Sequence, residues 1–243
     1  MAGKDDEYKS GTDTLEVISE AGKFNRWMYE TIKPYCSGNI LEIGSGIGNI
    51  SQYFLNDNFE ISLSDLSADY FRILESKFGS FSNLKGLFTL DFAEKELEQD
   101  YPNLIGQFDT VFALNVLEHV PDHEQSIRNC HKLLKPDGNL IILVPAFQSL
   151  FNQFDVALEH QRRYTPKTLK KVMSIPGFNI IHCQYFNSIG ILGWFVSGKL
   201  MGKNAIPGGQ MKLYDQLVPL WKVVDWFLRP LLGLSVICVA KKN

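Results

Sequence analysis

The segment ILEIGSGIGN at residues 40–49 runs from apolar residues directly into three glycines at alternate positions. The apolar residues predict a buried strand, and the glycines predict a tight turn that opens into a helix. Glycine at Gly44, Gly46 and Gly48 removes the Cβ atoms that would hold a ligand away from the backbone. A strand, turn and helix in this order is where α/β sheets bind nucleotide-like ligands.

The spacing of these glycines argues against two common phosphate-binding motifs. A dinucleotide fingerprint needs glycine at position 49, where Asn49 stands, and the third glycine comes one residue early at Gly48. A P-loop needs Gly-Lys-Ser/Thr after its first glycines, and no such sequence is present there. An NAD-dependent oxidoreductase is therefore the less favoured interpretation of the loop.

Short apolar runs like the one before the glycines recur along the chain, with helical patterns between them. This alternation is typical of an α/β protein in which helices cover both faces of a mostly parallel sheet. A doubly wound, Rossmann-like sheet of seven strands is predicted. The strands are expected at residues 39–43, 60–64, 86–90, 110–114, 139–144, 179–185 and 235–240.

Three helices are predicted with defined ends. The first, over residues 15–33, should stop before Pro34, because the residue preceding a proline is pushed out of helical geometry. The second, over residues 122–134, leads through a compact turn at residues 136–138 into the fifth strand. The third is an apolar stripe at three-or-four spacing that ends at Pro230. Its members are Leu213, Leu217, Leu220, Trp221, Val224, Phe227, Leu228 and Leu231.

The stripe belongs to a long connection, residues 187–233, that we expect to be a helical insertion between the last two strands. The first interpretation is that the stripe covers the sheet, because most apolar stripes are core. The second is a lid or acceptor-binding cover, a dimer face or a peripheral membrane contact. The chain is expected to be a monomer or a homodimer. No transmembrane segment is expected, because charged residues interrupt every apolar run.

Composition limits the remaining possibilities. The chain has 243 residues, 45% of them hydrophobic, which fits one domain over residues 1–243 with an N-terminal helical extension at residues 1–35. A net charge of -3 argues against a nucleic-acid partner, which needs a basic face. Residues 1–14 lack the apolar stretch of a signal peptide, so a cytoplasmic location is expected. The four cysteines are far apart, which predicts buried thiols rather than disulfides or a metal cluster.

The glycine segment resembles the first motif of the class I S-adenosylmethionine (SAM)-dependent methyltransferases. That motif is an acidic residue, any residue, and then three glycines at alternate positions, and Glu42 to Gly48 match it fully. The resemblance implies the sheet order 3-2-1-4-5-7-6 with the last strand antiparallel. It also implies that the loop, including Ser45, wraps the methionine and ribose portions of SAM.

Two acids after the second and third strands extend the resemblance. Asp65 lies in LSDLS at residues 63–67, and a carboxylate accepts two hydrogen bonds at once, which matches the paired hydroxyls of a ribose. Asp91 stands where the family usually carries an acid that accepts from the adenine amino group. Leu66 and Phe92 come directly after these acids in the implied cofactor site. The alternative is that each acid only caps the next helix.

The segment NVLEHVPD at residues 115–122 resembles the fourth motif of small-molecule methyltransferases, and LKPDG at residues 134–138 resembles the family's lead-in to the fifth strand. The resemblance implies that Asn115 and Val116 contact the methionine end of SAM. His119 is the candidate catalytic base, because a neutral imidazole can remove a proton from a hydroxyl near pH 7. The alternative is that His119 only hydrogen-bonds within the turn.

A divalent cation near this segment is not expected. Glu118, His119, Asp122 and His123 are close in sequence, but Pro121 interrupts any helical i, i+4 pair between the two histidines. The predicted metal content is therefore none.

The segment LEHQRRYT at residues 158–165 comes after the fifth strand, where this architecture places acceptor-binding elements. A similar His-x-Arg-Arg-Tyr stretch occurs in bacterial methyltransferase-like proteins of lipid or surface-polysaccharide assembly. His160, Arg162, Arg163 and Tyr164 are the candidate acceptor-binding residues, and an arginine pair suits an anionic group. The alternative is that one arginine pairs with Glu159 or Asp155 while Tyr164 packs before a helix that Thr165 caps.

The expected activity is transfer of the SAM methyl group, by in-line displacement, to a small-molecule, lipid or saccharide-type acceptor, leaving S-adenosylhomocysteine. Alignment of acceptor and methyl is the main demand of such a reaction. The first alternative is a SAM-binding protein without catalysis. The oxidoreductase is the second.

Overall fold

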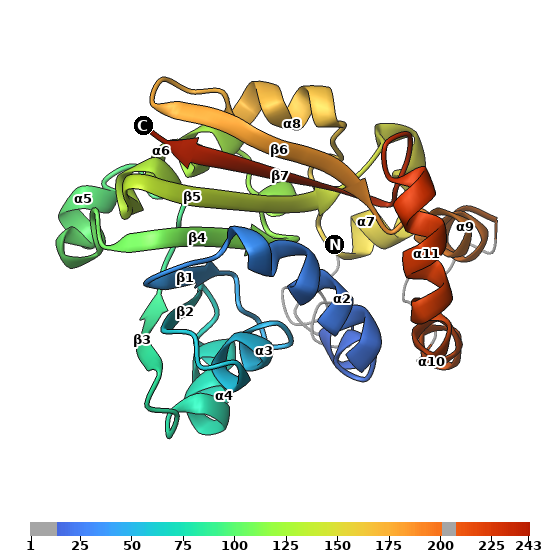
Figure 1. Cartoon of the computed structure of the whole chain (residues 1–243), viewed down its shortest axis with the longest axis horizontal. Helices are drawn as coiled ribbons and strands as arrows, with labels where there is room; N and C mark the ends of the chain where they lie inside the picture. Colours follow the sequence, from blue (N-terminus) through green and yellow to red (C-terminus); the bar gives the residue numbers. More distant parts are fainter. Residues whose placement is uncertain (1–13, 201–207) are drawn as a thin grey trace.

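A seven-stranded sheet of order β3-β2-β1-β4-β5-β7-β6 forms the centre of the molecule (Figure 1). The structure is a computed structural model that describes residues 14–200 and 208–243. The strands are β1 (Ile40–Ile43), β2 (Ile61–Asp65), β3 (Leu84–Thr89), β4 (Phe108–Leu114), β5 (Leu134–Pro145), β6 (Phe178–Phe186) and β7 (Ser235–Lys242). The predicted fold class and strand order are confirmed.

The direction of the strands brings most of their carboxyl ends to one edge of the sheet. β1 pairs in parallel with β2 and β4, β2 with β3, and β4 with β5. β7 is antiparallel to both β5 and β6, so β6 runs in the same direction as β5. We call the edge where β1 to β6 end, and where β7 begins, the carboxyl edge.

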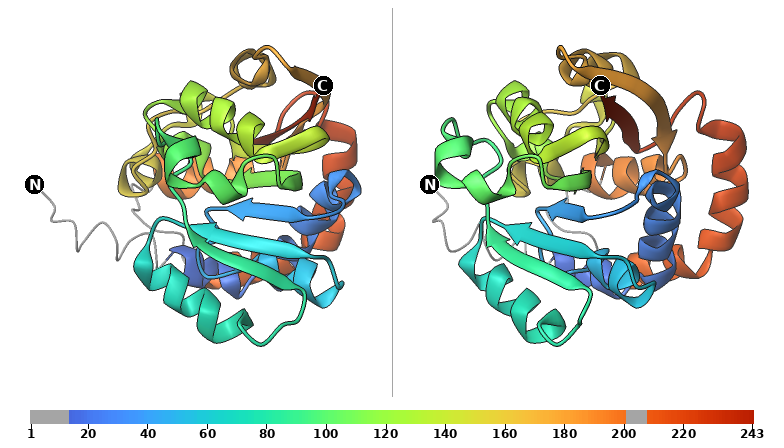
Figure 2. Two further views of the ribbon diagram at one scale, coloured as in Figure 1. Left: turned by 90° about the vertical axis from the view of Figure 1, so that its left-hand side faces the viewer. Right: turned by 60° about the vertical axis from the view of Figure 1, so that its left-hand side comes forward.

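Helices cover both faces of the sheet, as Figure 2 shows. The longer helices are α2 (Gly22–Ile32), α4 (Ala68–Phe78), α6 (His123–Leu133), α8 (Pro166–Met173), α10 (Gly208–Gln216) and α11 (Val218–Leu228). Shorter ones are α3 (Ser51–Asn56), α5 (Leu97–Asp100), α7 (Gln153–Ala157), α9 (Gly190–Trp194), the π-helical η5 (Phe195–Leu200) and the 3-10 turns η1 (Lys33–Tyr35), η2 (Pro102–Leu104), η3 (Leu117–His119) and η4 (Gln148–Leu150).

Alternate side chains of each inner strand feed two separate cores. On β5, Leu140 and Ile142 join the core beneath α5, α6 and α8, whereas Ile141 and Leu143 join the core beneath α2, α3 and α4. A strand buried on both faces reads as a continuous apolar run, which is why the sequence reveals the inner strands.

The predicted N-terminal helix is wrong as one continuous element. It is divided into a helical stretch at residues 14–19 and α2, because the backbone of Ala21 leaves helical geometry at φ -90° and ψ 65°. Side chains from outside this stretch bind its carbonyls: Asn49 Nδ2 donates to Leu15 O at 3.0 Å, and Asn25 Nδ2 donates to Ile18 O at 2.8 Å. The first stretch therefore folds back over the glycine loop.

The turn expected at residues 136–138 is a bulge inside β5. Phe108 pairs with Leu134 and Thr110 pairs with Asn139, so β5 carries extra residues between two consecutive pairing positions of β4. Asp137 adopts a left-handed φ of 64° there, a conformation that acidic and amide side chains tolerate better than most. The chain does turn at these residues, but β5 pairs with β4 both before and after them.

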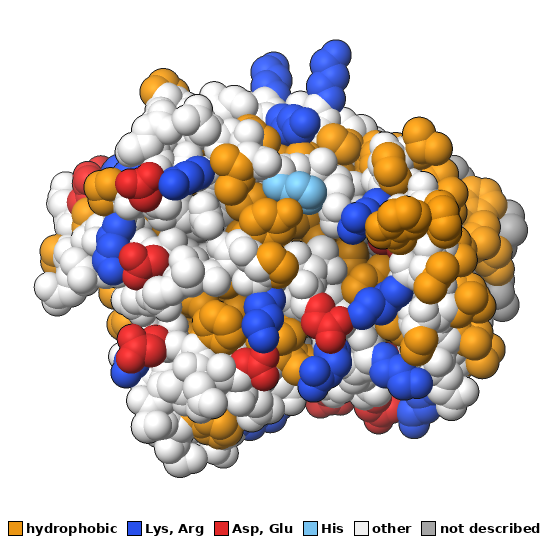
Figure 3. Space-filling view, in the orientation of Figure 1, with side chains coloured by type: hydrophobic (Ala, Val, Ile, Leu, Met, Phe, Trp, Pro, Cys, Tyr) orange, Lys and Arg blue, Asp and Glu red, His pale blue; other side chains and the backbone are white. Residues whose placement is uncertain are grey.

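The predicted apolar helix of the insertion is also divided, into α10 and α11, with the break at Leu217. Pro219 causes it, because proline lacks an N–H and its ring clashes with the preceding helical turn. The first interpretation of the stripe is wrong for most of its length. Within the stripe, Trp221 packs on the core, and Val218 next to the stripe is buried. Five of the eight stripe residues are exposed: Leu213, Leu217, Leu220, Phe227 and Leu231. Figure 3 shows apolar side chains gathered over α9 and α11.

Two residues at the end of β6 fasten this insertion to the carboxyl edge. Asn187 has a φ of 64°, and its Oδ1 accepts hydrogen bonds from Gly190 N at 2.9 Å and from Tyr214 Oη at 2.6 Å. The buried carboxylate of Asp225 on α11 accepts from the backbone N–H of Ser188 at 2.7 Å and from its hydroxyl. The insertion is thus anchored at its base, while its apolar face stays exposed.

The glycine loop provides a test of the fold. Gly48 has a φ of +82°, and a Cβ placed on it would lie 2.2 Å from Phe78 Cε2, so Gly48→Ala combines backbone strain with overpacking. We expect a loss of about 2–4 kcal/mol of unfolding free energy in urea denaturation. Gly106→Ala is the control, because Gly106 has a φ of +65° but nothing within 4 Å. Equal losses in the two variants would contradict close packing at Gly48.

Candidate active site

The glycine loop lies close to the end of β4. Gly44, Gly46 and Gly48 all have positive φ, at 70°, 54° and 82°. A Cβ on Gly44 would be 2.4 Å from Val116 Cγ2, and one on Gly46 would be 3.0 Å from Leu15 Cδ1. The absence of side chains on these glycines therefore lets Val116 and Leu15 close on the loop from two sides.

Glu42 lies beneath the loop rather than in it. Its side chain is buried, and the Ser51 hydroxyl at the start of α3 donates to Glu42 Oε2. Burial raises the pKa of Glu42 to about 8, so the folded protein keeps this carboxyl protonated at neutral pH. The contact joins β1 to α3 under the turn.

Asp65 at the end of β2 holds the loop from above. Its Oδ2 accepts from Gly46 N at 2.8 Å and its Oδ1 accepts from Ser67 N at 2.9 Å. Ser67, not Asp65, caps α4, because Tyr70 N donates to Ser67 Oγ at 3.4 Å. Each carboxylate oxygen has two lone pairs, so both can accept one further hydrogen bond from a ligand. Leu66 beside it is 65% exposed.

Asp91 lies just beyond β3 and does not cap a helix, since α5 begins only at Leu97. Its Oδ1 accepts from Ala93 N at 2.8 Å, and no hydrogen bond is assigned to its Oδ2 among the described residues. The Phe92 ring is buried in the core, and Phe92 O accepts from Asn129 Nδ2 at 2.9 Å. Phe92 therefore offers little free surface to a cofactor.

The end of β4 turns sharply at Asn115, which has a left-handed φ of 56° and donates from its backbone N–H to Leu143 O at 2.8 Å. Val116 then lies against the glycine loop. The predicted cofactor residues thus come from the carboxyl ends of four adjacent strands, β1 to β4. Their polar set suits an adenosine with an attached amino acid: acceptors for hydroxyl and amino groups, and a side-chain-free loop.

One turn further, Glu118, His119 and His160 converge, with one potential ligand atom from each lying within 4.8 Å of the others. The Glu118 side chain has no exposed surface, and neither carboxylate oxygen has a hydrogen-bond partner among the described residues. Burial raises its pKa to about 8. His160 Nε2 lies 3.9 Å from Glu118 Oε1, and His160 Nδ1 is 2.8 Å from Asp155 Oδ1.

His119 is the exposed member of this group. Its ring meets that of His160 edge to face, with 4.8 Å between centroids. Protein atoms crowd the ring even though one side faces solvent. This desolvation, together with the nearby His160 as the smaller cause, lowers the pKa of His119 to about 4. The imidazole is therefore neutral at pH 7.

The arginines of the HQRRY segment have partners within the protein. Arg163 has no exposed side-chain surface; its Nε donates to Asp155 Oδ1 at 2.7 Å, its Nη1 donates to Ala146 O at 3.0 Å, and its guanidinium lies 4.6 Å from the centroid of the Trp194 ring. Arg162 donates to Val120 O and Pro121 O, each at 3.0 Å. Pairing of Arg163 with Asp155 is thus present, while binding of an acceptor by either arginine stays a prediction.

Tyr164 and Thr165 complete the segment. The Tyr164 hydroxyl lies 2.8 Å from His123 Nδ1, and its ring is buried. Thr165 caps α8 in a reciprocal pair with Thr168, as the alternative interpretation expected. The segment is therefore bound to the turn after β4, and acceptor binding by Tyr164 stays a prediction as well.

Two residues that organise the site have weak signals in the sequence. Asp155 is fully buried and also accepts from Asn152 N at 2.9 Å, a capping pair that the spacing of Asn152 and Asp155 would have revealed. Trp194 comes from the insertion, and nothing in its local sequence indicates that it stacks on Arg163.

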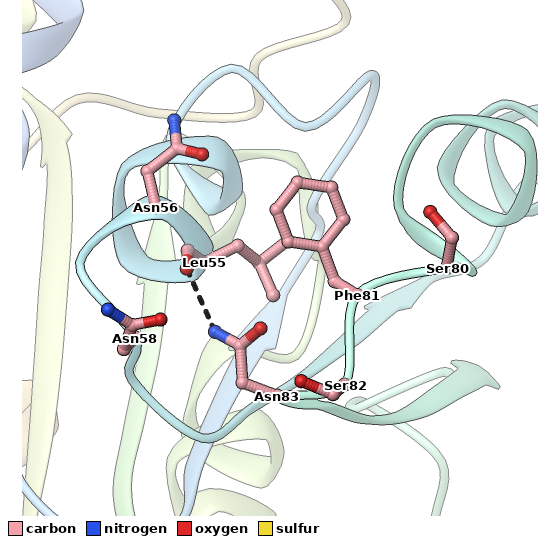
Figure 4. A pocket seen from close by; sticks show the side chains of 7 residues that line it. All are labelled: Leu55, Asn56, Asn58, Ser80, Phe81, Ser82 and Asn83. Atoms are coloured by element: carbon pink, nitrogen blue, oxygen red, sulfur yellow. Dashed lines mark hydrogen bonds between the residues drawn. The ribbon is translucent and has the colours of Figure 1, made fainter.

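Two surface hollows lie outside this group. Figure 4 shows one between the loops that lead into β2 and β3, where Asn83 Nδ2 donates to Leu55 O at 2.9 Å. It is at the opposite edge of the sheet. The other lies between α2, α11 and β6 and includes Trp27, His182 and Arg229. Neither contains a predicted site residue.

The four cysteines are thiols rather than disulfides, as their spacing predicts. All are free; Cys183 is half-buried and the others are buried.

Within residues 14–200 and 208–243, no helix is both long and apolar enough to cross a bilayer.

The raised pKa of Glu42 predicts a pH effect on stability. Between about pH 5 and 8 the folded protein holds a proton that the unfolded chain has released, so the unfolding free energy falls as pH rises, by at most about 1.4 kcal/mol per pH unit. Glu42→Gln should remove the contribution of Glu42 to the pH dependence of the unfolding free energy, measured by urea denaturation without cofactor. The contribution of Glu118 should remain. An unchanged slope would mean that Glu42 is already ionised in the folded protein.

Comparisons with known proteins agree with the geometry. The methyltransferase domain family model matches residues 41–140. Probable polyketide synthase 33 of Dictyostelium discoideum is 29% identical over 187 residues, which cover 61% of this chain and 6% of that protein. The chain thus spans only a small part of that relative.

Two solved structures share the fold. A SAM-dependent methyltransferase from Archaeoglobus fulgidus has a TM-score of 0.59 at 19% identity, over 90% of this chain and 94% of that one. The [4+2]-cyclase SpnF has a TM-score of 0.60 at 16% identity, over 90% of this chain and 80% of that one. The matched family segment contains the glycine loop, Asp65, Asp91 and the end of β4, and it lies on a sheet of the expected order. Residues 41–140 of this chain therefore form a methyltransferase domain, on the fold that SAM-dependent methyltransferases share.

Proposed function

We propose that this chain transfers the methyl group of SAM to a small-molecule, lipid or saccharide-type acceptor by in-line displacement. The observation that carries the proposal is the contact of Val116 with the glycine loop at Gly44. Glu118 and His119 come within one turn of Val116. A cofactor on the loop and an acceptor at the polar cluster would therefore be neighbours, which is the alignment that methyl transfer demands.

SAM supplies a methyl group on a positively charged sulfur. Asp65 is suited to the ribose hydroxyls, because each of its oxygens already accepts one backbone N–H and retains a lone pair. The exposed Leu66 offers an apolar surface for the adenine ring. The other residues that would hold the cofactor are Gly44, Ser45, Gly46, Gly48, Asp91, Asn115 and Val116, with Glu42 supporting the loop from below.

His119 is positioned to serve the acceptor side. Its neutral ring at pH 7 leaves a nitrogen lone pair for a proton or another electrophile. Arg163 and Asp155 balance each other's charge, whereas both oxygens of Glu118 lack a hydrogen-bond partner among the described residues.

The acceptor we propose has an apolar part. The insertion leaves Leu192 on α9 and Trp226 and Phe227 on α11 more than half exposed. It is fastened to the carboxyl edge through Asn187 and Ser188, on the same side of the sheet as the site. Similarity to a polyketide synthase, whose name refers to small-molecule synthesis, also supports a small apolar acceptor.

The main alternative is a SAM-binding protein that catalyses another reaction or none. The similarity in fold to a [4+2]-cyclase gives this alternative a specific basis. The nicotinamide alternative has lost support, because the antiparallel β7 between β5 and β6 departs from the all-parallel dinucleotide-binding order.

Cofactor binding can be tested at Asp65. Asp65→Asn replaces one accepting oxygen by an NH2 group beside the N–H donors of Gly46 and Ser67. We expect about 10–100-fold weaker binding of S-adenosylhomocysteine in calorimetry, the effect of losing a hydrogen bond to a charged group. Asp69→Asn is the control, because Asp69 is exposed on α4 in a surface pair with Arg72. Equal affinities in both variants would contradict the assignment.

Turnover separates the enzyme from the alternatives. The protein is incubated with SAM and apolar acceptors that carry a hydroxyl, an amine or an activated carbon, and S-adenosylhomocysteine is quantified by mass spectrometry. We expect acceptor-dependent release with at least one class. Tight cofactor binding without release for any class would favour the non-methylating alternative.

A further inference from the structure

The Glu118 side chain is a buried carboxyl group to which no described residue donates a hydrogen bond. It has no exposed surface, and both oxygens lack a hydrogen-bond partner among the described residues. Burying an unpaired polar group is costly, so native proteins satisfy nearly all of them with a partner, a water or an ion. The carboxyl group of Glu118 therefore has unused capacity to bind a ligand.

Two imidazoles flank this carboxyl group. His160 Nε2 lies 3.9 Å from Glu118 Oε1, and a ring nitrogen of His119 completes a set of three atoms within 4.8 Å of one another. Two histidines and one carboxylate are a ligand set of catalytic zinc sites and of non-haem iron sites. Small side-chain adjustments would bring such atoms to bonding distance of one ion.

His160 is already oriented as a ligand. Its Nδ1 faces Asp155 Oδ1 at 2.8 Å, which directs Nε2 toward Glu118. Metal-binding histidines commonly donate their second ring N–H to a carboxylate, which fixes the tautomer and the ring orientation. Arg163, whose side chain is fully buried, donates to the same Asp155 oxygen at 2.7 Å.

The charges around the cluster also favour a cation. Asp155 is paired with Arg163, so the Arg163 charge is already balanced, and neither oxygen of Glu118 has a hydrogen-bond partner among the described residues. A divalent ion would be bound by one carboxylate and two neutral nitrogens. Imidazole ligands favour zinc or another transition metal over magnesium or calcium, which prefer oxygen.

We propose that Glu118, His119 and His160 bind one divalent transition-metal ion, with Zn²⁺ as the most suitable. Three protein ligands leave at least one position open, as in catalytic zinc sites. Because His119 is exposed while the side chains of Glu118 and His160 are buried, the open position faces the solvent side, where the acceptor is proposed to lie. This role rests on the proposed function and narrows the acceptor to one that presents an oxygen, nitrogen or sulfur atom to the metal.

The proposed ion departs from the expectation of no metal, which considered only neighbours in the sequence. Asp122 caps α6 by accepting from Gln125 N at 2.9 Å, and His123 lies against Tyr164. Neither faces the cluster. The third ligand comes instead from His160, which the chain brings to Glu118 where Gln161 N donates to Glu118 O at 2.8 Å.

The test uses Co²⁺ as a spectroscopic probe and Zn²⁺ in calorimetry, with untagged, EDTA-treated protein and neither SAM nor acceptor. We expect one Co²⁺ per chain, with the strong visible bands of a low-coordinate site, and displacement by Zn²⁺. His160→Ala and Glu118→Gln should weaken Zn²⁺ binding by more than about 100-fold, and Asp155→Asn by about 10–100-fold. His182→Ala is the control, because His182 stacks on Tyr35 away from the cluster.

The affinity of each variant for S-adenosylhomocysteine shows whether the variant is folded. It also separates the proposed metal site from the proposed methyltransferase function. Retained affinity with lost Zn²⁺ binding supports the site. Failure of the parent protein to bind Co²⁺ or Zn²⁺ near one per chain overturns it, as does equal Zn²⁺ affinity in a folded His160→Ala variant. A parent protein that binds the ion but not S-adenosylhomocysteine would keep the metal site and remove the proposed function.

Discussion

The site depends on the way strands end in a parallel sheet. Strands that run in one direction release the chain at one edge, and here the chain must turn at once to clear its neighbours. Left-handed backbone provides the turns: Gly44 after β1, Asn115 after β4, Phe147 after β5 and Asn187 after β6. Such conformations are unfavourable for residues other than glycine and persist only where surrounding structure determines them. The two buried cores of the sheet supply that rigidity.

Phe147 illustrates how strongly the edge is constrained. An aromatic side chain rarely takes a positive φ, yet Phe147 N donates to Tyr164 O at 2.8 Å, and Tyr164 N donates to Pro145 O at 2.9 Å. These bonds extend the pairing of β5 onto the HQRRY segment. Asp155 then binds the segment from the other side through Arg163 and His160. The chain beyond β5 is therefore a fixed wall of the site rather than a loose connection.

The sequence reveals the parts of this arrangement that repeat at short range. Inner strands appear as apolar runs, and the glycine loop and the acids after β2 and β3 appear at fixed places relative to them. The helix break at Ala21 escapes prediction, because apolar periodicity continues across it and only backbone geometry interrupts the helix. The break at Leu217 has a signal in the sequence, Pro219, which the continuous apolar stripe outweighed. The meeting of Glu118 with His160 could not be predicted at all. It depends on how the chain after β5 folds back, and no local pattern encodes that distance.

The position of β7 has a consequence for how the protein is made. β7 lies between β5 and β6, so β6 has no strand neighbour other than β7. While the ribosome is still synthesising residues before 235, β5 exposes an unpaired edge and β6 has no place in the sheet. Unpaired strand edges promote association between chains during synthesis. The insertion at residues 187–233 separates β6 from β7 along the chain, so it lengthens the interval in which this edge of β5 lacks its partner.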